Sequence, residues 1–236
     1  MRQNFATVVA AIALIGSLTP PALSSRPVVT EQGMTAYHPQ DVLSTAEDFF
    51  QRGVDRIQSG DTVGAIEDFT AALERNPNAI EAYCNRGIAY AMMGNFAAAE
   101  QDLNDALQID PQHADAYEKR GTVAAQQGHF EAALTDFNRA IAIDPTTIDS
   151  YYNRAMVFQL QGNAEAAIAD FSQVIAIDNS VAEAYGSRGL LLNEQGDRDL
   201  ALSDLQTAAR LFEAQGDRSA YEQTLEFIEA IQAAAP

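Results

Sequence analysis

The feature that most constrains this chain is a motif that recurs every 34 residues, through five units, without insertion or deletion. Four positions of the motif hold a small residue, a glycine, an aromatic residue and a large apolar residue. These columns are Ala65, Ala99, Ala133, Ala167 and Ala201; Gly60, Gly94, Gly128, Gly162 and Gly196; Phe49, Tyr83, Tyr117, Tyr151 and Tyr185; and Phe69, Leu103, Phe137, Phe171 and Leu205. A unit of this length cannot bury its apolar face alone, so the period predicts a stack in which neighbouring units form the core.

Each unit carries signals for two helices joined by a short turn. The glycine column is expected to end the first helix, because glycine adopts positive φ at little cost. The residue after each glycine starts the turn into the second helix, and three units end on a proline that disfavours helix in the residue before it. These two sets are Asp61, Asn95, His129, Asn163 and Asp197, and Pro77, Pro111 and Pro145.

The second unit resembles the tetratricopeptide repeat (TPR) pattern closely. Its matching residues are Tyr83, Gly87, Tyr90, Gly94, Ala99, Leu103, Ala106 and Pro111. Later units depart from the pattern at Ala155, Asn179 and Glu213. The resemblance implies an all-α fold: a right-handed TPR superhelical solenoid of antiparallel helix pairs. The five expected units are 46–79, 80–113, 114–147, 148–181 and 182–215, followed by a C-terminal capping helix at 216–236 with a polar outer face.

The N-terminal segment has the order of regions found in a secretory signal peptide. No charged residue lies between Arg2 and Arg26, and an apolar run that ends at Leu18 precedes two prolines and small residues. We predict a signal peptide at 1–24 and a flexible tether at 25–45, with an uncleaved anchor as the alternative. The expected location is the periplasm, or the thylakoid lumen if the similarity of the motifs to cyanobacterial TPR proteins extends to the source.

Composition excludes several classes of partner. The chain has 33 acidic and 14 basic residues, so its formal net charge is −19. Phosphate backbones and anionic membrane surfaces are bound through lysine and arginine, so neither nucleic acid nor membrane is an expected partner unless the N-terminal segment is retained as an anchor. Basic or neutral partners fit better than acidic ones. Cys84 is the only cysteine, which excludes an intrachain disulfide and a cysteine-rich metal site.

Two charged columns also keep the period. An arginine of the first helix is expected to meet an aspartate of the second, in the same or an adjacent unit, with about 0–1 kcal/mol per pair where exposed. These columns are Arg52, Arg86, Arg120, Arg154 and Arg188, and Asp68, Asp102, Asp136, Asp170 and Asp204. A further acidic column begins every first helix, where it complements the helix dipole: Glu47, Glu81, Asp115, Asp149 and Glu183.

The resemblance places a concave groove on the first helices and implies that a peptide binds there. The candidate peptide-binding residues are Cys84, Asn85, Ile88, Met92, Glu118, Lys119, Tyr152, Asn153 and Met156. Asn85 and Asn153 would bond a peptide backbone, and Tyr152 would supply apolar contact. The chaperone-type carboxylate clamp is rejected, because the corresponding positions hold few of its residues and Asp115 would repel a carboxylate.

Little in the sequence supports catalysis. No two of the three histidines are spaced for a zinc motif on one helix, and no glycine-rich phosphate loop or nucleophile elbow occurs. We therefore predict an exported, non-catalytic scaffold with no cofactor and no metal, which binds a protein or peptide. A role in assembling an envelope or photosynthetic complex would follow by analogy only. The alternatives are a self-associating structural spacer and an accessory subunit of an exported enzyme.

Overall fold

The computed structural model describes residues 45–233. The predicted signal peptide and nearly all of the predicted tether lie outside this range. Within it, the chain forms α-helices and no strand. The helices are α2 (Ala46–Gln58), α3 (Thr62–Arg75), α4 (Ile80–Met92), α5 (Phe96–Ile109), α6 (Ala114–Gln126), α7 (Phe130–Ile143), α8 (Ile148–Leu160), α9 (Ala164–Ile177), α10 (Ala182–Gln195), α11 (Arg198–Gln215) and α12 (Arg218–Ala233). The predicted all-α class is confirmed.

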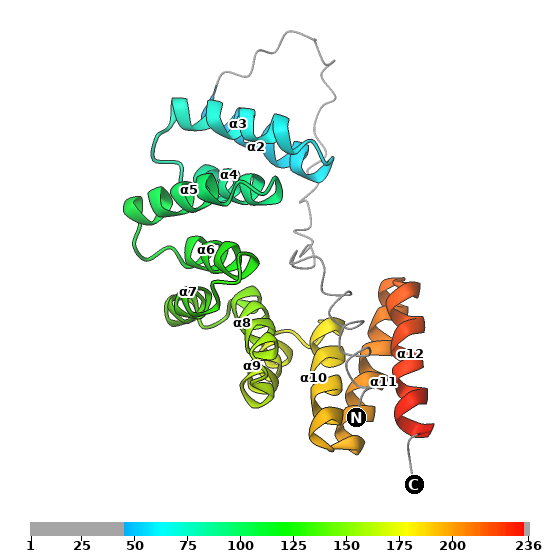
Figure 1. Cartoon of the computed structure of the whole chain (residues 1–236). Helices are drawn as coiled ribbons and strands as arrows, with labels where there is room; N and C mark the ends of the chain where they lie inside the picture. The colour runs from blue at the N-terminus through cyan, green and yellow to red at the C-terminus, as the bar shows by residue number, and fades with distance from the viewer. Residues whose placement is uncertain (1–44, 234–236) are drawn as a thin grey trace.

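The helices stack as consecutive pairs, which also confirms the predicted solenoid. Each first helix packs against the second helix of its own pair, and each second helix packs against the first helix of the next pair. Successive first helices from α2 to α8 also touch one another. Figure 1 shows that the stack curves into an arc, with α4, α6 and α8 on its inner side and α5, α7 and α9 on its outer side.

The turn within each pair follows from two adjacent residues. The glycine has φ between 75° and 91° in all five pairs, so it reverses the chain in the left-handed region. The following residue precedes the second helix, and in three pairs its side chain accepts a hydrogen bond from the backbone N–H three residues on. Those three residues are Asp61, Asn95 and Asn163. The turn chemistry predicted from sequence is therefore what ends one helix and begins the next.

The core consists of the repeated small and large apolar columns. All five alanines of the alanine column are fully buried, as are Phe69, Phe137 and Phe171. A Cβ added to Gly121 would lie 2.8 Å from the Phe137 ring. The small residues of the first helices therefore let the two helices of a pair approach closely.

The last helix covers the end of the stack. Ile228 and Ile231 of α12 are buried in one cluster with Leu205 and Ala209 of α11. Glutamates of α12 are exposed on the opposite side. This arrangement confirms the predicted capping helix. Within residues 45–233, no helix is both long and apolar enough to span a membrane.

Candidate binding face on the first helices

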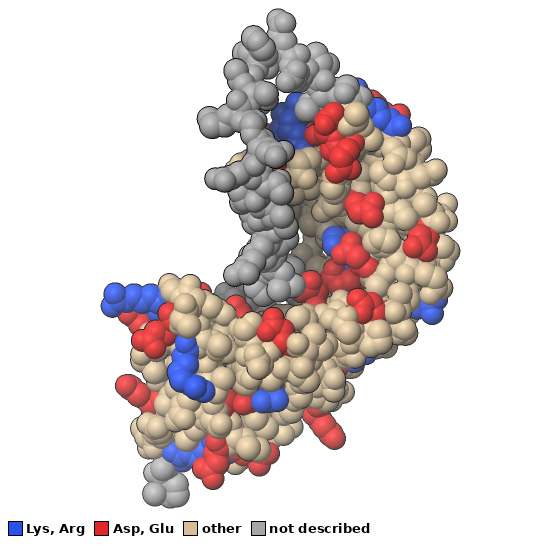
Figure 2. Space-filling model, turned by 180° about the vertical axis from the view of Figure 1, so that it is seen from behind, with Lys and Arg blue, Asp and Glu red and all other residues tan. Residues whose placement is uncertain are grey.

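The inner side of the arc forms a hollowed face, which we call the inner face. It is built from the first helices α2, α4, α6, α8 and α10. Figure 2 shows the hollow and acidic side chains gathered along its wall. The first turns of these helices carry Glu47, Glu81, Asp115, Asp149 and Glu183. The acidic column predicted from sequence thus lies at one end of every first helix.

The arginine and aspartate columns hold the scaffold together. In every unit the arginine donates from Nε and Nη2 to the two carboxylate oxygens of the aspartate in the same unit. The predicted pairing is confirmed, and the energy given for exposed pairs does not apply to these carboxylates. The aspartates are buried, with exposures from 1% for Asp68 to 8% for Asp204. They therefore depend on their arginines for neutralisation far more than surface carboxylates would.

A third contact of the arginine reaches the preceding unit. Nη1 donates to a polar side chain on the second helix of that unit, 16 residues earlier in the chain. The acceptors are Thr70, Asn104, Asn138 and Ser172 for Arg86, Arg120, Arg154 and Arg188. Each of these arginines consequently joins two units. The sequence reasoning missed this link, because the acceptor column varies in residue type.

The middle of the inner face holds a polar cluster from α6 and α8. Asn153 of α8 donates from Nδ2 to Glu118 Oε1 at 2.8 Å and to Thr122 Oγ1 at 3.2 Å. Thr122 also donates to Glu118 Oε1 at 2.8 Å. Lys119, the only lysine of the chain, forms an ion pair with Asp115 four residues earlier. These contacts tie neighbouring first helices together across the floor of the face.

The charges of this cluster influence one another. Burial raises the pKa of Glu118, an effect that Lys119 and the Thr122 hydroxyl oppose and that Asp115 and Asp149 reinforce. For Lys119, burial lowers the pKa, but the carboxylates of Asp115 and Glu118 outweigh it and raise the pKa overall. The cluster therefore keeps a cationic lysine among several carboxyl groups.

The nine predicted peptide-binding residues divide into two groups in the structure. Met92 is exposed, and Asn85, Ile88, Lys119 and Tyr152 are partly exposed. The others are buried: Cys84, Glu118, Asn153 and Met156. Cys84 and Met156 belong to the hydrophobic core clusters, where small or flexible side chains fill space between helices. Their location differs from the solvent-facing one that the groove prediction assumed.

The two asparagines are already engaged within the protein. Asn85 Nδ2 donates to the Glu81 carbonyl at 2.8 Å, which leaves its amide oxygen for a ligand. The Asn153 amide nitrogen is used by Glu118 and Thr122. Sequence reasoning assigned both amides to a peptide backbone and did not anticipate these internal partners. The spacing in the sequence could have indicated the Glu118–Asn153 contact, because these residues are one period and one residue apart.

Tyr152 of α8 contacts α9 and lies near α10. Its ring meets the Phe171 ring edge-on, with 5.5 Å between the centroids. Its hydroxyl lies near Ser187 of α10, and burial raises its pKa to about 12. Tyr152 therefore contributes to packing as well as to the inner face.

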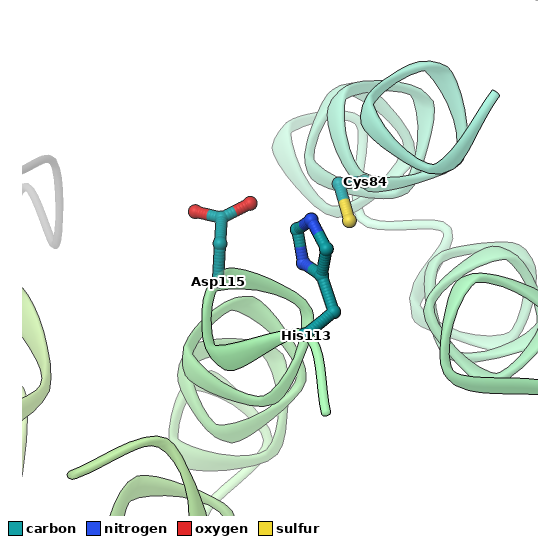
Figure 3. Close-up of side chains that lie close together, drawn as sticks. All are labelled: Cys84, His113 and Asp115. Atoms are coloured by element: carbon teal, nitrogen blue, oxygen red, sulfur yellow. The ribbon is translucent and has the colours of Figure 1, made fainter. Parts of the chain in front are cut away.

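Three side chains that could hold a metal ion converge beside the polar cluster. The Cys84 sulfur, a ring nitrogen of His113 and a carboxylate oxygen of Asp115 all lie within 4.8 Å of one another. Figure 3 shows the far ring nitrogen, Nε2, between the thiol and the carboxylate. The other ring nitrogen, Nδ1, accepts from the Ala116 backbone N–H at 3.2 Å and caps α6. No zinc-type spacing on one helix indicates this set, because its members come from two units.

Family models for tetratricopeptide repeats match most of the stack. One model described as "Tetratricopeptide repeat" matches residues 80–113, and another with that description matches 148–181. A model described as "TPR repeat" matches 53–94 and 123–162. Together the matches cover just over half of the 236 residues. The chain belongs to the tetratricopeptide repeat family.

Solved structures of the same fold support this assignment. The crystal structure of MamA has a TM-score of 0.60 and 28% identity, covering 70% of this chain and 96% of MamA. TTC0263, described as a thermophilic TPR protein in Thermus thermophilus, has a TM-score of 0.65 and 21% identity, with 77% and 99% covered. YrrB, described as a TPR protein with an unusual peptide-binding site, has a TM-score of 0.55 and 20% identity, with 77% and 92% covered. Comparison with curated protein sequences gives no match.

Proposed function

We propose that this TPR protein is an exported, non-catalytic scaffold whose inner face binds a protein or peptide segment. The observation that carries the proposal is the inner face itself: a hollowed surface along stacked first helices, lined by an acidic column and by partly exposed apolar and amide groups. YrrB, which has the same fold, is described as a TPR protein with an unusual peptide-binding site. Assembly of an envelope or photosynthetic complex is the role that we infer for such a scaffold.

The charge of the inner face favours a basic ligand. Glu81, Asp115 and Asp149 belong to three successive first helices, and the buried Glu118 interacts electrostatically with Asp115 and Asp149. Lys119 provides the local positive charge and is already paired with Asp115. A segment with lysine or arginine side chains, or a free amino terminus, would therefore gain charge-assisted hydrogen bonds on this face. We propose such a segment as the ligand.

Partner capture with charge-neutralised variants tests the binding face. The full chain with a C-terminal tag, expressed in its native host, would be compared with the triple variant Glu81→Gln, Asp115→Asn and Asp149→Asn. The matched control neutralises three exposed acids of second helices instead: Glu67→Gln, Glu100→Gln and Glu165→Gln. Both variants change the net charge equally and leave the arginine–aspartate pairs intact.

The expected result is a partner that is retained by the wild type and the control but lost from the inner-face variant. A synthetic copy of the partner's contact segment should then bind the wild type and lose affinity as salt is raised. Retention of the partner by the inner-face variant would place the binding elsewhere. Loss from both variants would indicate that only the overall negative charge matters.

Export is tested separately. We expect the protein in the exported fraction, with an N-terminus that begins near residue 25. Cell fractionation followed by N-terminal sequencing measures both. A protein that retains Met1 in the cytosolic fraction would contradict the proposed location without affecting the proposed binding face.

A further inference from the structure

We propose that Cys84, His113 and Asp115 form a binding site for one thiophilic divalent metal ion of the zinc class. The proposal rests on a different observation from the partner discussed above, although both involve Asp115. Its basis is the convergence of three different ligand types from separate places in the fold: α4, the residue before α6, and the first turn of α6. Figure 3 shows the His113 ring between the Cys84 sulfur and the Asp115 carboxylate.

The geometry requires only a small adjustment. Ligand atoms around a tetrahedral zinc ion lie about 2.0–2.3 Å from the metal and therefore roughly 3.5 Å from one another. The sulfur, nitrogen and oxygen atoms here lie within 4.8 Å of one another. A contraction of up to about 1.3 Å between the ligand atoms would give all three metal–ligand distances. The helices that carry them pack directly against each other, so the backbone already holds the set in place.

The donor set selects the class of metal. A thiolate, an imidazole nitrogen and a carboxylate oxygen together suit zinc, whereas magnesium and calcium take oxygen ligands. Three protein ligands leave a fourth position for water. Asp115 is exposed and Cys84 is buried, so the open position is expected on the solvent side of the site.

Metal binding releases one proton and replaces contacts that His113 and Asp115 make in the metal-free protein. The Cys84 thiol loses one proton to solvent, and Asp115 already carries a negative charge, so the divalent ion and its two anionic ligands are neutral together. His113 Nδ1 accepts from the Ala116 N–H, so in the metal-free protein Nε2 carries the ring proton. When Nε2 binds the metal, that proton moves to Nδ1. Nδ1 then no longer accepts the hydrogen bond from the Ala116 N–H that caps α6. Asp115 gives up its ion pair with Lys119 in order to bind the metal. Lys119 retains Glu118 as a neighbouring carboxylate.

The surroundings favour a cation at this position. Glu81 and Glu118 act electrostatically on Cys84. Asp149 interacts with Asp115, whereas Lys119 adds one positive charge near the thiol. The carboxylate charges raise the local cation concentration. The buried thiol is otherwise an ordinary core residue, and its position next to an imidazole and a carboxylate is what distinguishes it.

Metal titration of the full chain, after treatment with a chelator, tests the proposal. Zn²⁺ binding would be followed by calorimetry in buffers of different ionisation enthalpy, which reports released protons. Co²⁺ would serve as the spectroscopic probe, because a thiolate ligand gives a charge-transfer band and a tetrahedral site gives strong visible bands. We expect one ion per chain, one proton released and a thiolate band.

Four variants separate ligation from folding and from charge. His113→Asn removes the imidazole but keeps a side chain that caps α6 well. Cys84→Ser retains the size of the buried side chain, and Asp115→Asn retains the shape of the carboxylate. Asp149→Asn is the matched control, because it removes the same charge from the equivalent position of the next unit. Circular dichroism verifies that each variant folds.

Each of the three ligand variants should weaken Zn²⁺ binding by more than about 100-fold, since even outer-shell changes weaken metal sites by about 10–100-fold. Cys84→Ser should also abolish the thiolate band, and Asp149→Asn should change affinity by less than about tenfold. Failure of the wild type to bind Zn²⁺ would overturn the proposal. So would a Co²⁺ spectrum without a thiolate band, or equal effects of Asp115→Asn and Asp149→Asn. If Cys84→Ser does not fold, His113→Asn decides, because an unchanged affinity there would also overturn it.

Discussion

At the scale of the single residue, the arginines of the first helices contribute to stability in two ways, because each binds a buried carboxylate of its own unit and four of the five also contact the preceding unit. Arg120 donates to Asp136 at 2.7–2.8 Å and to Asn104 at 2.7 Å. Its guanidinium also lies over the Tyr117 ring, with Cζ 5.5 Å from the ring centroid. Sequence reasoning predicted the Arg120–Asp136 pair from its period. The bond to Asn104 was not predictable in this way, because threonine, asparagine and serine share that column.

Arg120→Met is expected to lower the free energy of unfolding by about 2 kcal/mol. The value lies below the roughly 3–5 kcal/mol for a fully buried pair, because the Arg120 side chain keeps some solvent contact. Urea denaturation followed by circular dichroism measures the change. Arg52→Met is the matched control, since Asp68 keeps a second partner, Arg56, at 3.1 Å. Equal losses in the two variants would contradict this account of the buried carboxylates.

Glu118 gives a pH-dependent prediction. Burial raises the pKa of Glu118 above its ordinary value of 4.5, so the folded protein holds this proton more tightly than the unfolded chain does. Stability therefore decreases as pH rises from 4.5 through the raised pKa, where the unfolded state carries fewer protons. Glu118→Gln keeps an oxygen acceptor for Asn153 and Thr122 and removes this penalty.

We accordingly expect Glu118→Gln to melt at a higher temperature than the wild type at neutral pH. Each 1 kcal/mol of stabilisation corresponds to about 2–4 °C for a protein of this size. The difference should shrink toward zero below pH 4.5, where the wild-type carboxyl is also neutral. Thermal melts over a series of pH values provide the measurement. A variant that melts lower than the wild type at neutral pH would show that the Lys119 and Asn153 contacts outweigh the burial cost.

At the scale of the helix, spacing in the chain carries most of the information. The glycine column and the capping residues predicted the turns, because positive φ and side-chain capping are local properties of the chain. The close approach of paired helices is likewise visible in the small residues at one position: Gly53, Gly87, Gly121, Ala155 and Gly189. The environment of each side chain on the inner face was less accessible, because it depends on which neighbouring helix lies opposite. Cys84 and Met156 are examples, because both were predicted to contact a peptide and both are buried.

Gly121→Ala is expected to destabilise the third unit. The new Cβ would lie 2.8 Å from Phe137 and 3.2 Å from the Ala133 carbonyl oxygen, so the ring must move. Overpacking of this kind costs about 1–3 kcal/mol, and better helix propensity returns up to about 1 kcal/mol. The net loss should appear as a lower urea midpoint.

Ala155→Gly is the companion variant in the fourth unit. It removes a buried methyl group and lowers helix propensity, so it should also destabilise, by about 1–2 kcal/mol. The two opposite substitutions in one column should thus both reduce stability. A stabilised Gly121→Ala protein would disprove the close-packing explanation for this column.

At the scale of the whole molecule, stability is the sum of neighbouring interfaces, and the ends of the stack need protection. The period predicted how many pairs there are and that they stack. It did not predict the curvature of the arc, because curvature follows from small differences in side-chain packing between successive first helices. The partner surface depends on that curvature as much as on residue identity.

Removal of residues 216–236 tests the role of α12. The truncation would expose Leu205, Ala209 and Phe212 of α11 to solvent. We expect a lower melting temperature and stronger concentration-dependent association than in the full chain, because the new end face is apolar. Sedimentation velocity at several concentrations measures the association. Unchanged sedimentation and melting would mean that α11 alone is a sufficient end for the stack.

The central claim is that the first helices bind the partner, and hydrogen–deuterium exchange of the captured complex tests it most directly. With the full chain free and bound, peptides from α4, α6 and α8 should become protected on binding, whereas those from α5, α7 and α9 should change little. The triple variant Glu81→Gln, Asp115→Asn and Asp149→Asn should lose this protection. Protection confined to α5, α7 and α9, or to α12, would contradict the claim and move the binding surface to the outer side or the end of the stack.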